Sequence, residues 1–127
     1  MAFVALVTLL ILCQYVVFMG LCGKARAESG LLAPAVVGDE SFERAYRVQM
    51  NTLEQLIVFV LAMLLFSSYV SARWVWIPGL LFIVGRQLYA MEYVNKPSTR
   101  VPGMALTLLA NTVLLVGSLV AVVIKMF

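Results

Sequence analysis

The sequence predicts an all-α integral membrane protein, folded as a bundle of four transmembrane helices. Hydrophobic residues occupy 64% of the 127 positions and charged residues only 12%, whereas a soluble chain is typically about 25% charged. The apolar residues also fall into four long blocks, and four spans of about 20 residues each would leave only short connections. We therefore expect one membrane domain over residues 1–127. A soluble enzyme, a disordered tail and a large domain outside the bilayer are excluded.

The first span is expected at residues 2–23, an apolar block interrupted by Thr8 and Gln14. Ala25-Arg26-Ala27 resembles a signal-peptidase site. However, no basic segment precedes the block, and it is longer than the about 7–15 residues of a signal-peptide core. A retained span is therefore expected. Residues 24–41 contain Gly, Pro, Ser and charges of both signs, which predicts a loop.

The second span is expected at residues 42–70, with polar first turns and an apolar remainder. After a tight connection, the third span is expected at residues 74–95. It begins with Trp74 and Trp76, which are typical of an anchor at the membrane interface.

A turn is predicted at residues 96–99, because Pro97 disfavours a helical conformation of Lys96. Ser98 or Thr99 can then cap the next helix. The fourth span is expected at residues 101–126, with Pro102 in its first turn, where proline is tolerated.

Basic residues are distributed unequally between the two sides of this bundle. Seven lie at the first and third connections or the adjoining helix ends, against two on the other side: Lys24, Arg26, Arg44, Arg47, Arg86, Lys96 and Arg100, against Arg73 and Lys125. The positive-inside rule then places the first and third loops in the cytoplasm. An anionic ligand bound on that side would explain the same bias.

The second span carries a polar face where it enters the membrane. Arg44, Arg47, Asn51 and Glu54 fall within about 80° of one another at 100° per residue. Such groups are costly in hydrocarbon unless they face protein or a water-filled cavity.

The third span repeats this pattern, with Arg86, Tyr89 and Tyr93 on one face and Arg100 just beyond the turn. The two polar faces are therefore expected to converge. A structural network, with Arg47 paired to Glu54 or Glu43, is one interpretation. We favour a site for a small anionic ligand with several carboxylates, because packing alone does not need so many guanidinium groups on one side.

The absence of histidine excludes several kinds of catalytic and metal-binding site. The chain has no histidine, which excludes a histidine general base, histidine-ligated haem and zinc sites that contain histidine. We expect no metal. Nucleic acid is not an expected partner, because the basic residues are few and scattered.

The same residues carry a family resemblance. Residues 43–54 closely resemble the E-R-x-x-R-x-x-x-N-x-x-E signature of the MAPEG family, the membrane-associated proteins in eicosanoid and glutathione metabolism. The likeness continues through residues 86–93 to Arg100 and covers essentially the whole chain. Within the family, the sequence is most similar to the microsomal glutathione transferases and leukotriene C4 synthase.

The resemblance implies a homotrimer of four-helix subunits, with glutathione bound as co-substrate between neighbouring subunits near one membrane face. By analogy, Arg100 is the catalytic residue at the sulfur atom. Seven residues would hold the tripeptide: Arg26, Arg47, Gln49, Asn51, Glu54, Tyr89 and Tyr93.

The chemistry of glutathione fits this set of side chains. Arg26 and Arg47 can bind its two carboxylates and Glu54 its ammonium group. A thiol with a pKa of about 8.5 is a poor nucleophile until it ionises. Arg100 cannot be a general base, because a guanidinium stays protonated, but it can stabilise the thiolate. The thiolate would attack a lipophilic electrophile or a lipid hydroperoxide that enters from the bilayer.

Two departures from the family pattern narrow the expected activity. Gln55 and Thr112 stand where leukotriene C4 synthase has a tyrosine and a tryptophan. We therefore expect a general glutathione transferase, located in a bacterial inner membrane, with conjugation, peroxidase and isomerase activities left open.

Two alternative functions would require residues that differ from those in this sequence. A non-catalytic lipid-binding member of the family would lack the arginines found here at positions 47 and 100. A small multidrug transporter would carry an acidic residue in the first span, and this span has none.

Overall fold

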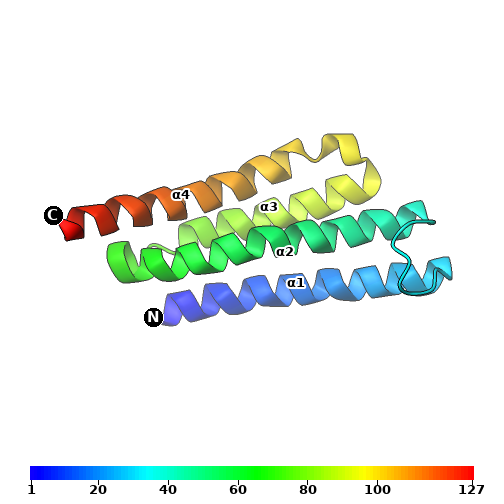
Figure 1. Cartoon of the computed structure of the whole chain (residues 1–127), viewed down its shortest axis with the longest axis horizontal. Helices are drawn as coiled ribbons and strands as arrows, with labels where there is room; N and C mark the ends of the chain where they lie inside the picture. The colour runs from blue at the N-terminus through cyan, green and yellow to red at the C-terminus, as the bar shows by residue number, and fades with distance from the viewer.

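The computed structural model describes all 127 residues and shows four long helices, each antiparallel to the next in the chain (Figure 1). Two short helical segments, the π-helix η1 and the 3₁₀-helix η2, lie between them. In chain order the elements are α1 (Ala2–Ser29), α2 (Glu40–Phe66), η1 (Ser67–Ser71), α3 (Trp76–Asn95), η2 (Pro97–Thr99) and α4 (Val101–Met126). Helices α2 and α3 form the middle of the bundle, with α1 packed on one side and α4 on the other. Both termini lie at one end, and the α1–α2 and α3–α4 connections lie at the other (Figure 1).

Helix α1 is longer than the sequence predicts. It continues through the segment expected to be a loop and ends at Gly30, whose φ of 70° is the left-handed conformation common at helix ends. An exposed ion pair between Lys24 and Glu28, 3.7 Å apart, joins successive turns of this extension. The prediction of a loop from residue 24 was wrong, because the charged residues after position 23 continue the helix as an exposed end.

The boundaries of α2 and α3 also differ from those predicted. Asp39 caps α2, accepting a hydrogen bond from the backbone nitrogen of Phe42 at 2.8 Å, so the helix starts at Glu40. Its helical run continues through η1 to Ser71. Helix α3 then starts at Trp76, two residues later than expected.

The turn before α4 forms where it was predicted, but the predicted N-terminal cap of α4 does not form. Lys96 is extended, with φ of −151°, as expected before Pro97. The predicted capping role of Ser98 or Thr99 was wrong, because α4 has no side-chain cap. The hydroxyl of Thr99 instead donates to the carbonyl oxygen of Lys96 at 2.7 Å, within the η2 turn.

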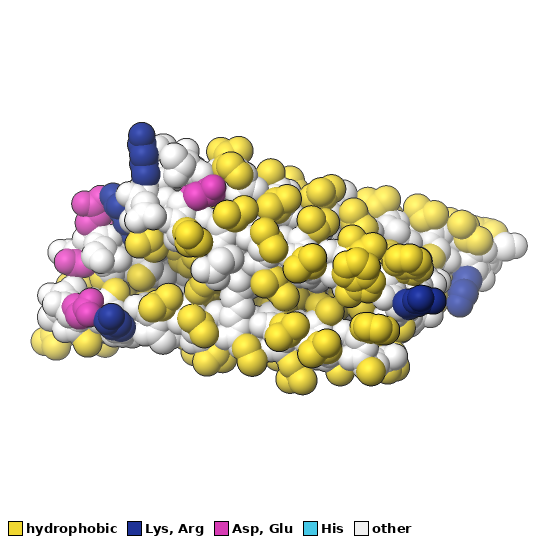
Figure 2. Space-filling model, turned by 180° about the vertical axis from the view of Figure 1, so that it is seen from behind, with side chains coloured by type: hydrophobic (Ala, Val, Ile, Leu, Met, Phe, Trp, Pro, Cys, Tyr) yellow, Lys and Arg dark blue, Asp and Glu magenta, His cyan; other side chains and the backbone are white.

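Three helical runs are long and apolar enough to cross a membrane: Ala2–Ser29, Glu40–Ser71 and Val101–Met126. Helix α3 is not among them; its 20 residues include Arg86 and Glu92. The predicted span at residues 74–95 therefore stays a prediction. Figure 2 shows hydrophobic side chains over the middle of one face of the bundle and charged side chains at its two ends.

Two glycines allow α3 and α4 to approach closely. A Cβ on Gly103 would lie 2.4 Å from the backbone nitrogen of Tyr89, and one on Gly85 would lie 2.9 Å from that of Thr107. Because real Cβ atoms do not approach so closely, a side chain at either position would force the helices apart. This contact brings the start of α4 against the part of α3 that carries the tyrosines.

Candidate functional site

A buried arginine lies where the two polar faces meet. The side chain of Arg86, on α3, is only 1% exposed. Its Nε and Nη2 atoms donate to the hydroxyl of Thr52 at 3.2 and 3.0 Å, and Nη2 also donates to Oδ1 of Asn51 at 3.0 Å. The convergence of the polar faces of the second and third helices is therefore observed.

The polar contacts continue along α2 to the surface of the chain. Nδ2 of Asn51 donates to Glu54 at 3.3 Å, and Glu54 forms an ion pair of 3.8 Å with Arg47. Arg47 and Glu54 are 52% and 53% exposed. Of the two partners predicted for Arg47, the structure has Glu54; Glu43 instead accepts from the backbone nitrogen of Gly38 at 2.8 Å. A chain of polar contacts thus runs from a buried cation to an exposed ion pair.

Two tyrosines extend this site along α3. The guanidinium carbon of Arg86 lies 4.2 Å from the ring centroid of Tyr89, which stacks on Tyr93 with 5.4 Å between ring centroids. Gly103, three residues after Arg100, packs against the backbone of Tyr89, so Arg100 lies at the same end of the site. Arg100 itself is exposed, and its Nη1 donates to the carbonyl oxygen of Pro97 at 3.0 Å.

A cleft of about 340 Å³ lies beside these residues, between α2, α3 and α4. One part of its wall is polar and the other part is apolar. The polar part consists of Asn51, Gln55, Arg86 and Thr107, and the apolar part of Val101, Met104, Ala105 and Leu108. The arrangement can hold a molecule with both a polar and an apolar portion.

Of the predicted binding residues only Asn51 lines this cleft, and Arg26 and Gln49 lie apart from both the cleft and the chain of polar contacts. Nη1 of Arg26 donates to the carbonyl oxygen of Ala35 at 2.8 Å, and its guanidinium carbon lies 4.3 Å from the ring centroid of Phe42. Gln49 follows Arg47 by two positions and so projects about 200° away from it on the helix. Contacts through Arg86 therefore join Arg47, Asn51, Glu54, Tyr89 and Tyr93, but not Arg26 or Gln49. Arg100 makes no hydrogen bond or ion pair with this group and lies one helical turn before Gly103, which packs against Tyr89.

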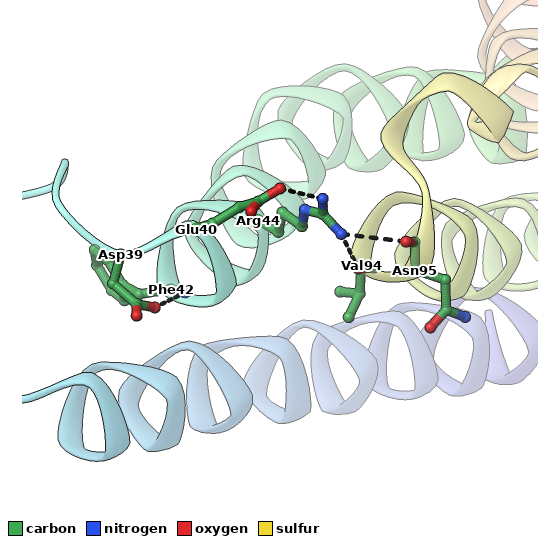
Figure 3. A network of polar contacts seen from close by, with 6 residues as sticks. All are labelled: Asp39, Glu40, Phe42, Arg44, Val94 and Asn95. Carbon is green, nitrogen blue, oxygen red and sulfur yellow. Dashed lines mark hydrogen bonds and ion pairs between the residues drawn. The ribbon is translucent and has the colours of Figure 1, made fainter.

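Arg44 has a different role from the one its place on the polar face suggests. Its Nη1 donates to the carbonyl oxygens of Val94 and Asn95 at 2.8 and 3.1 Å, and its Nη2 pairs with Glu40 (Figure 3). It therefore binds the last carbonyls of α3, which have no partner within the helix.

Sequence reasoning also missed Thr52 and the contact between Gln55 and Asn111. Thr52 accepts from Arg86 and donates to the carbonyl oxygen of Val48 at 2.7 Å. Nδ2 of Asn111 donates to Gln55 at 2.8 Å and so joins α4 to α2. The only signal for either in the sequence was a polar residue inside an apolar helix.

Comparison with known proteins decides the family. The family model described as MAPEG matches residues 4–120. The chain belongs to the MAPEG family. The resemblance drawn from the sequence is confirmed, and membership of this membrane family together with the three apolar helical runs identifies a membrane protein.

Several MAPEG relatives are similar over most of the chain. An uncharacterized protein of Synechocystis sp. is 41% identical over 118 residues, which cover 93% of this chain and 86% of that protein. Microsomal glutathione S-transferase 2 of Homo sapiens is 34% identical over 104 residues, covering 82% of this chain and 71% of the relative. The Mus musculus protein of the same name is 35% identical with the same coverage.

Proposed function

We propose that this protein is a membrane-bound glutathione transferase, which activates the thiol of glutathione for attack on lipophilic electrophiles. The observation that carries the proposal is the chain of contacts from Arg47 through Glu54 and Asn51 to buried Arg86, beside a cleft with an apolar wall. Two similar relatives are named microsomal glutathione S-transferase 2, which supports the same activity.

Charge complementarity explains how this site would hold glutathione. The tripeptide has two carboxylates and one ammonium group at neutral pH, which suit Arg47 and Glu54 respectively. Both side chains are about half exposed, so they can exchange their mutual ion pair for ligand contacts at little cost. Asn51, Tyr89 and Tyr93 would supply hydrogen bonds and a stacking surface deeper in the site.

The remaining two binding residues support a site shared between subunits of a homotrimer. Arg26 and Gln49 lie away from the cleft of their own chain. In the proposed assembly they reach the cleft of a neighbouring subunit, where Arg26 binds the second carboxylate. One glutathione would then touch two chains.

We further propose that α3 is a fourth membrane span. Its 20 residues correspond to about 30 Å of helix, the thickness of a typical hydrocarbon core. It packs against α1, α2 and α4, and its one arginine is buried against protein. The excess of basic residues at the end with the α1–α2 and α3–α4 connections favours a cytoplasmic location for that end, in a bacterial inner membrane.

Arg100 is the proposed catalytic residue. It lies directly after the η2 turn and before α4, one helical turn ahead of Gly103, which packs against the backbone of Tyr89. Its guanidinium would stabilise the thiolate while the thiol proton leaves to solvent. The sulfur lone pair then forms the bond to the electrophilic carbon, and the leaving group departs with its bonding electrons.

Conjugation of glutathione to a lipophilic aryl halide by the detergent-purified protein tests the proposal. We expect a rate above the uncatalysed reaction, lowered at neutral pH in Arg100→Ala and retained in Arg73→Ala, which removes an exposed arginine elsewhere. Reduction of a lipid hydroperoxide, assayed in parallel, decides whether the thiolate also serves a peroxidase reaction. A protein that binds glutathione but transforms neither substrate would be a binding protein, and one that does not bind glutathione would overturn the proposal.

A further inference from the structure

We propose that Arg86 is a positioning residue that sets the orientation of Asn51 and Tyr89 for glutathione, and that Thr52 holds Arg86 in place. The inference rests on the proposed function and assigns a role within that site to the buried arginine. Neither Arg86 nor Thr52 is needed to touch the reacting sulfur.

The burial of Arg86 indicates a purpose beyond packing. Its guanidinium is 1% exposed, and its hydrogen-bond partners are the neutral oxygens of Asn51 and Thr52 rather than a carboxylate. Removing such a charge from water is costly, and apolar residues of similar volume are often as stable or more stable at buried sites. A side chain that only filled space between α2 and α3 would not need to be an arginine.

Thr52 fixes the plane of the guanidinium. Its hydroxyl hydrogen is committed to the carbonyl oxygen of Val48 at 2.7 Å, so its lone pairs face Arg86 and accept from both Nε and Nη2. Because these two donors are held in one rigid plane, the direction of the remaining N–H groups is fixed as well.

The fixed guanidinium decides which way the amide of Asn51 points. Nη2 of Arg86 donates to Oδ1 of Asn51, so the amide oxygen faces the cation and Nδ2 faces Glu54 at 3.3 Å. The flipped amide would direct its N–H groups at the guanidinium, donor against donor, and its oxygen at a carboxylate. Arg86 therefore ensures that Asn51 presents a donor toward the exposed part of the site.

The same guanidinium restrains Tyr89. It lies 4.2 Å from the ring centroid, within the range of a cation–π contact. Tyr89 in turn stacks on Tyr93. One buried cation thus contacts the α2 and α3 sides of the site at once.

The test uses variants of Arg86 itself, which lines the cleft, and of Thr52, which holds Arg86 and does not line the cleft. Thr52 is 1% exposed, so Thr52→Val keeps the shape but removes the acceptor, and Thr52→Ser restores the hydroxyl. Arg86→Met removes the cation and leaves an apolar side chain of similar length. Ser118→Ala is the matched control, since Ser118 is a buried hydroxyl bonded only to the carbonyl oxygens of Ala62 and Leu114.

Two measurements are made on each detergent-purified variant: the Kd of glutathione by calorimetry, and the side-chain amide spectrum after selective ¹⁵N-asparagine labelling. The chain has three asparagines, Asn51, Asn95 and Asn111, so two amides serve as internal references. We expect Thr52→Val and Arg86→Met to raise the Kd about tenfold, with a shift of the Asn51 amide alone. Thr52→Ser and Ser118→Ala should match the wild type, and the melting temperature of Arg86→Met should be unchanged or higher.

The outcomes separate this inference from the function on which it rests. If Thr52→Val and Arg86→Met leave the Asn51 amide and the Kd unchanged while the wild type binds glutathione, the positioning role is overturned and the proposed function stands. If Arg86→Met unfolds and Thr52→Val binds normally, Arg86 is a structural residue only. If the wild type binds no glutathione, the proposed function fails, and the assignment of Arg86 to a glutathione site fails with it.

Discussion

Nη1 of Arg44, on α2, lies 2.8 Å from the carbonyl oxygen of Val94, in the last turn of α3. The same atom bonds the carbonyl oxygen of Asn95, so a side chain from one helix completes the end of another (Figure 3). This contact fixes the point at which the chain turns toward Arg100.

We expect Arg44→Met to destabilise the protein by about 1–3 kcal/mol, because the variant removes charge-assisted hydrogen bonds to carbonyls that have no other partner. Thermal unfolding in detergent measures the loss. Lys24→Met is the control, since it removes only an exposed ion pair, which contributes little. An equal loss in both variants would assign Arg44 no special role.

The Arg100→Ala variant should lose rate rather than affinity. If Arg100 stabilises the thiolate, its removal raises the pKa of the bound thiol, and each unit corresponds to about 1.36 kcal/mol or tenfold in the ionised fraction. We expect kcat to fall about tenfold or more at neutral pH with little change in the Kd of glutathione. Because a higher thiol pKa moves the rate–pH profile to higher pH, activity should recover in alkaline buffer. A uniform loss at every pH would remove Arg100 from thiol activation.

Replacing either member of the exposed ion pair should weaken glutathione binding. Arg47→Ala and Glu54→Gln each remove one charged partner of the ligand, and such a contact is worth about 1.5–3 kcal/mol, or roughly tenfold or more in Kd. Calorimetry measures the affinity, and light scattering checks that the assembly is intact. Unaltered affinity in both variants would indicate that the ion pair of Arg47 and Glu54 has a purely structural role.

The shared site can be tested by mixing two weakened chains. At limiting glutathione, Arg26→Ala and Arg47→Ala should each have low activity alone, because every site lacks one arginine. Co-expressed chains should regain part of the activity, since a site built from Arg47 of one variant and Arg26 of the other is complete. No recovery in isolated mixed assemblies would indicate that both arginines serve the same chain's site.

Gly103→Ala should be strongly destabilising, although it adds only one methyl group. The added Cβ would meet the backbone nitrogen of Tyr89 at 2.4 Å, and overpacking of this kind typically costs about 1–3 kcal/mol. Gly20→Ala is the matched control, because outside its chain neighbours and its own helix backbone no atom lies within 4 Å of the position that its added methyl group would take. We expect that control to be neutral or slightly stabilising in thermal unfolding, since alanine favours a helix more than glycine does.

The helices and the convergence of their polar faces could be predicted because both depend on local periodicity. The spacing of Arg47 and Glu54 on one helix, and of Arg86 and Tyr89 on another, fixes which side chains share a face whatever surrounds them. The end of α1 was harder to locate, since charged residues after an apolar block are equally compatible with a loop and with an exposed helical turn.

Hydrophobic periodicity did not predict the contacts between helices. Arg44 lies on the same face as Arg47, yet it bonds α3 because the end of that helix happens to lie within its reach. Thr52 is a single threonine in a helix, a common occurrence, and only the depth of Arg86 makes it a bonding partner. Such roles depend on the relative placement of α2 and α3, which hydrophobic periodicity does not specify.

The glycines at positions 85 and 103 have a mechanical consequence. At these positions the backbones of α3 and the start of α4 are in direct contact. Sliding or rotation of one helix past the other would create a steric clash, so we expect the α3–α4 hairpin to move as a rigid unit. The connection between α1 and α2, residues 30–39, is held instead by side chains: Arg26 donates to the carbonyl oxygen of Ala35, and Glu43 accepts from the backbone nitrogen of Gly38. Such contacts can be exchanged without separating two helix backbones, so we expect any adjustment on ligand binding at this connection rather than within the α3–α4 hairpin.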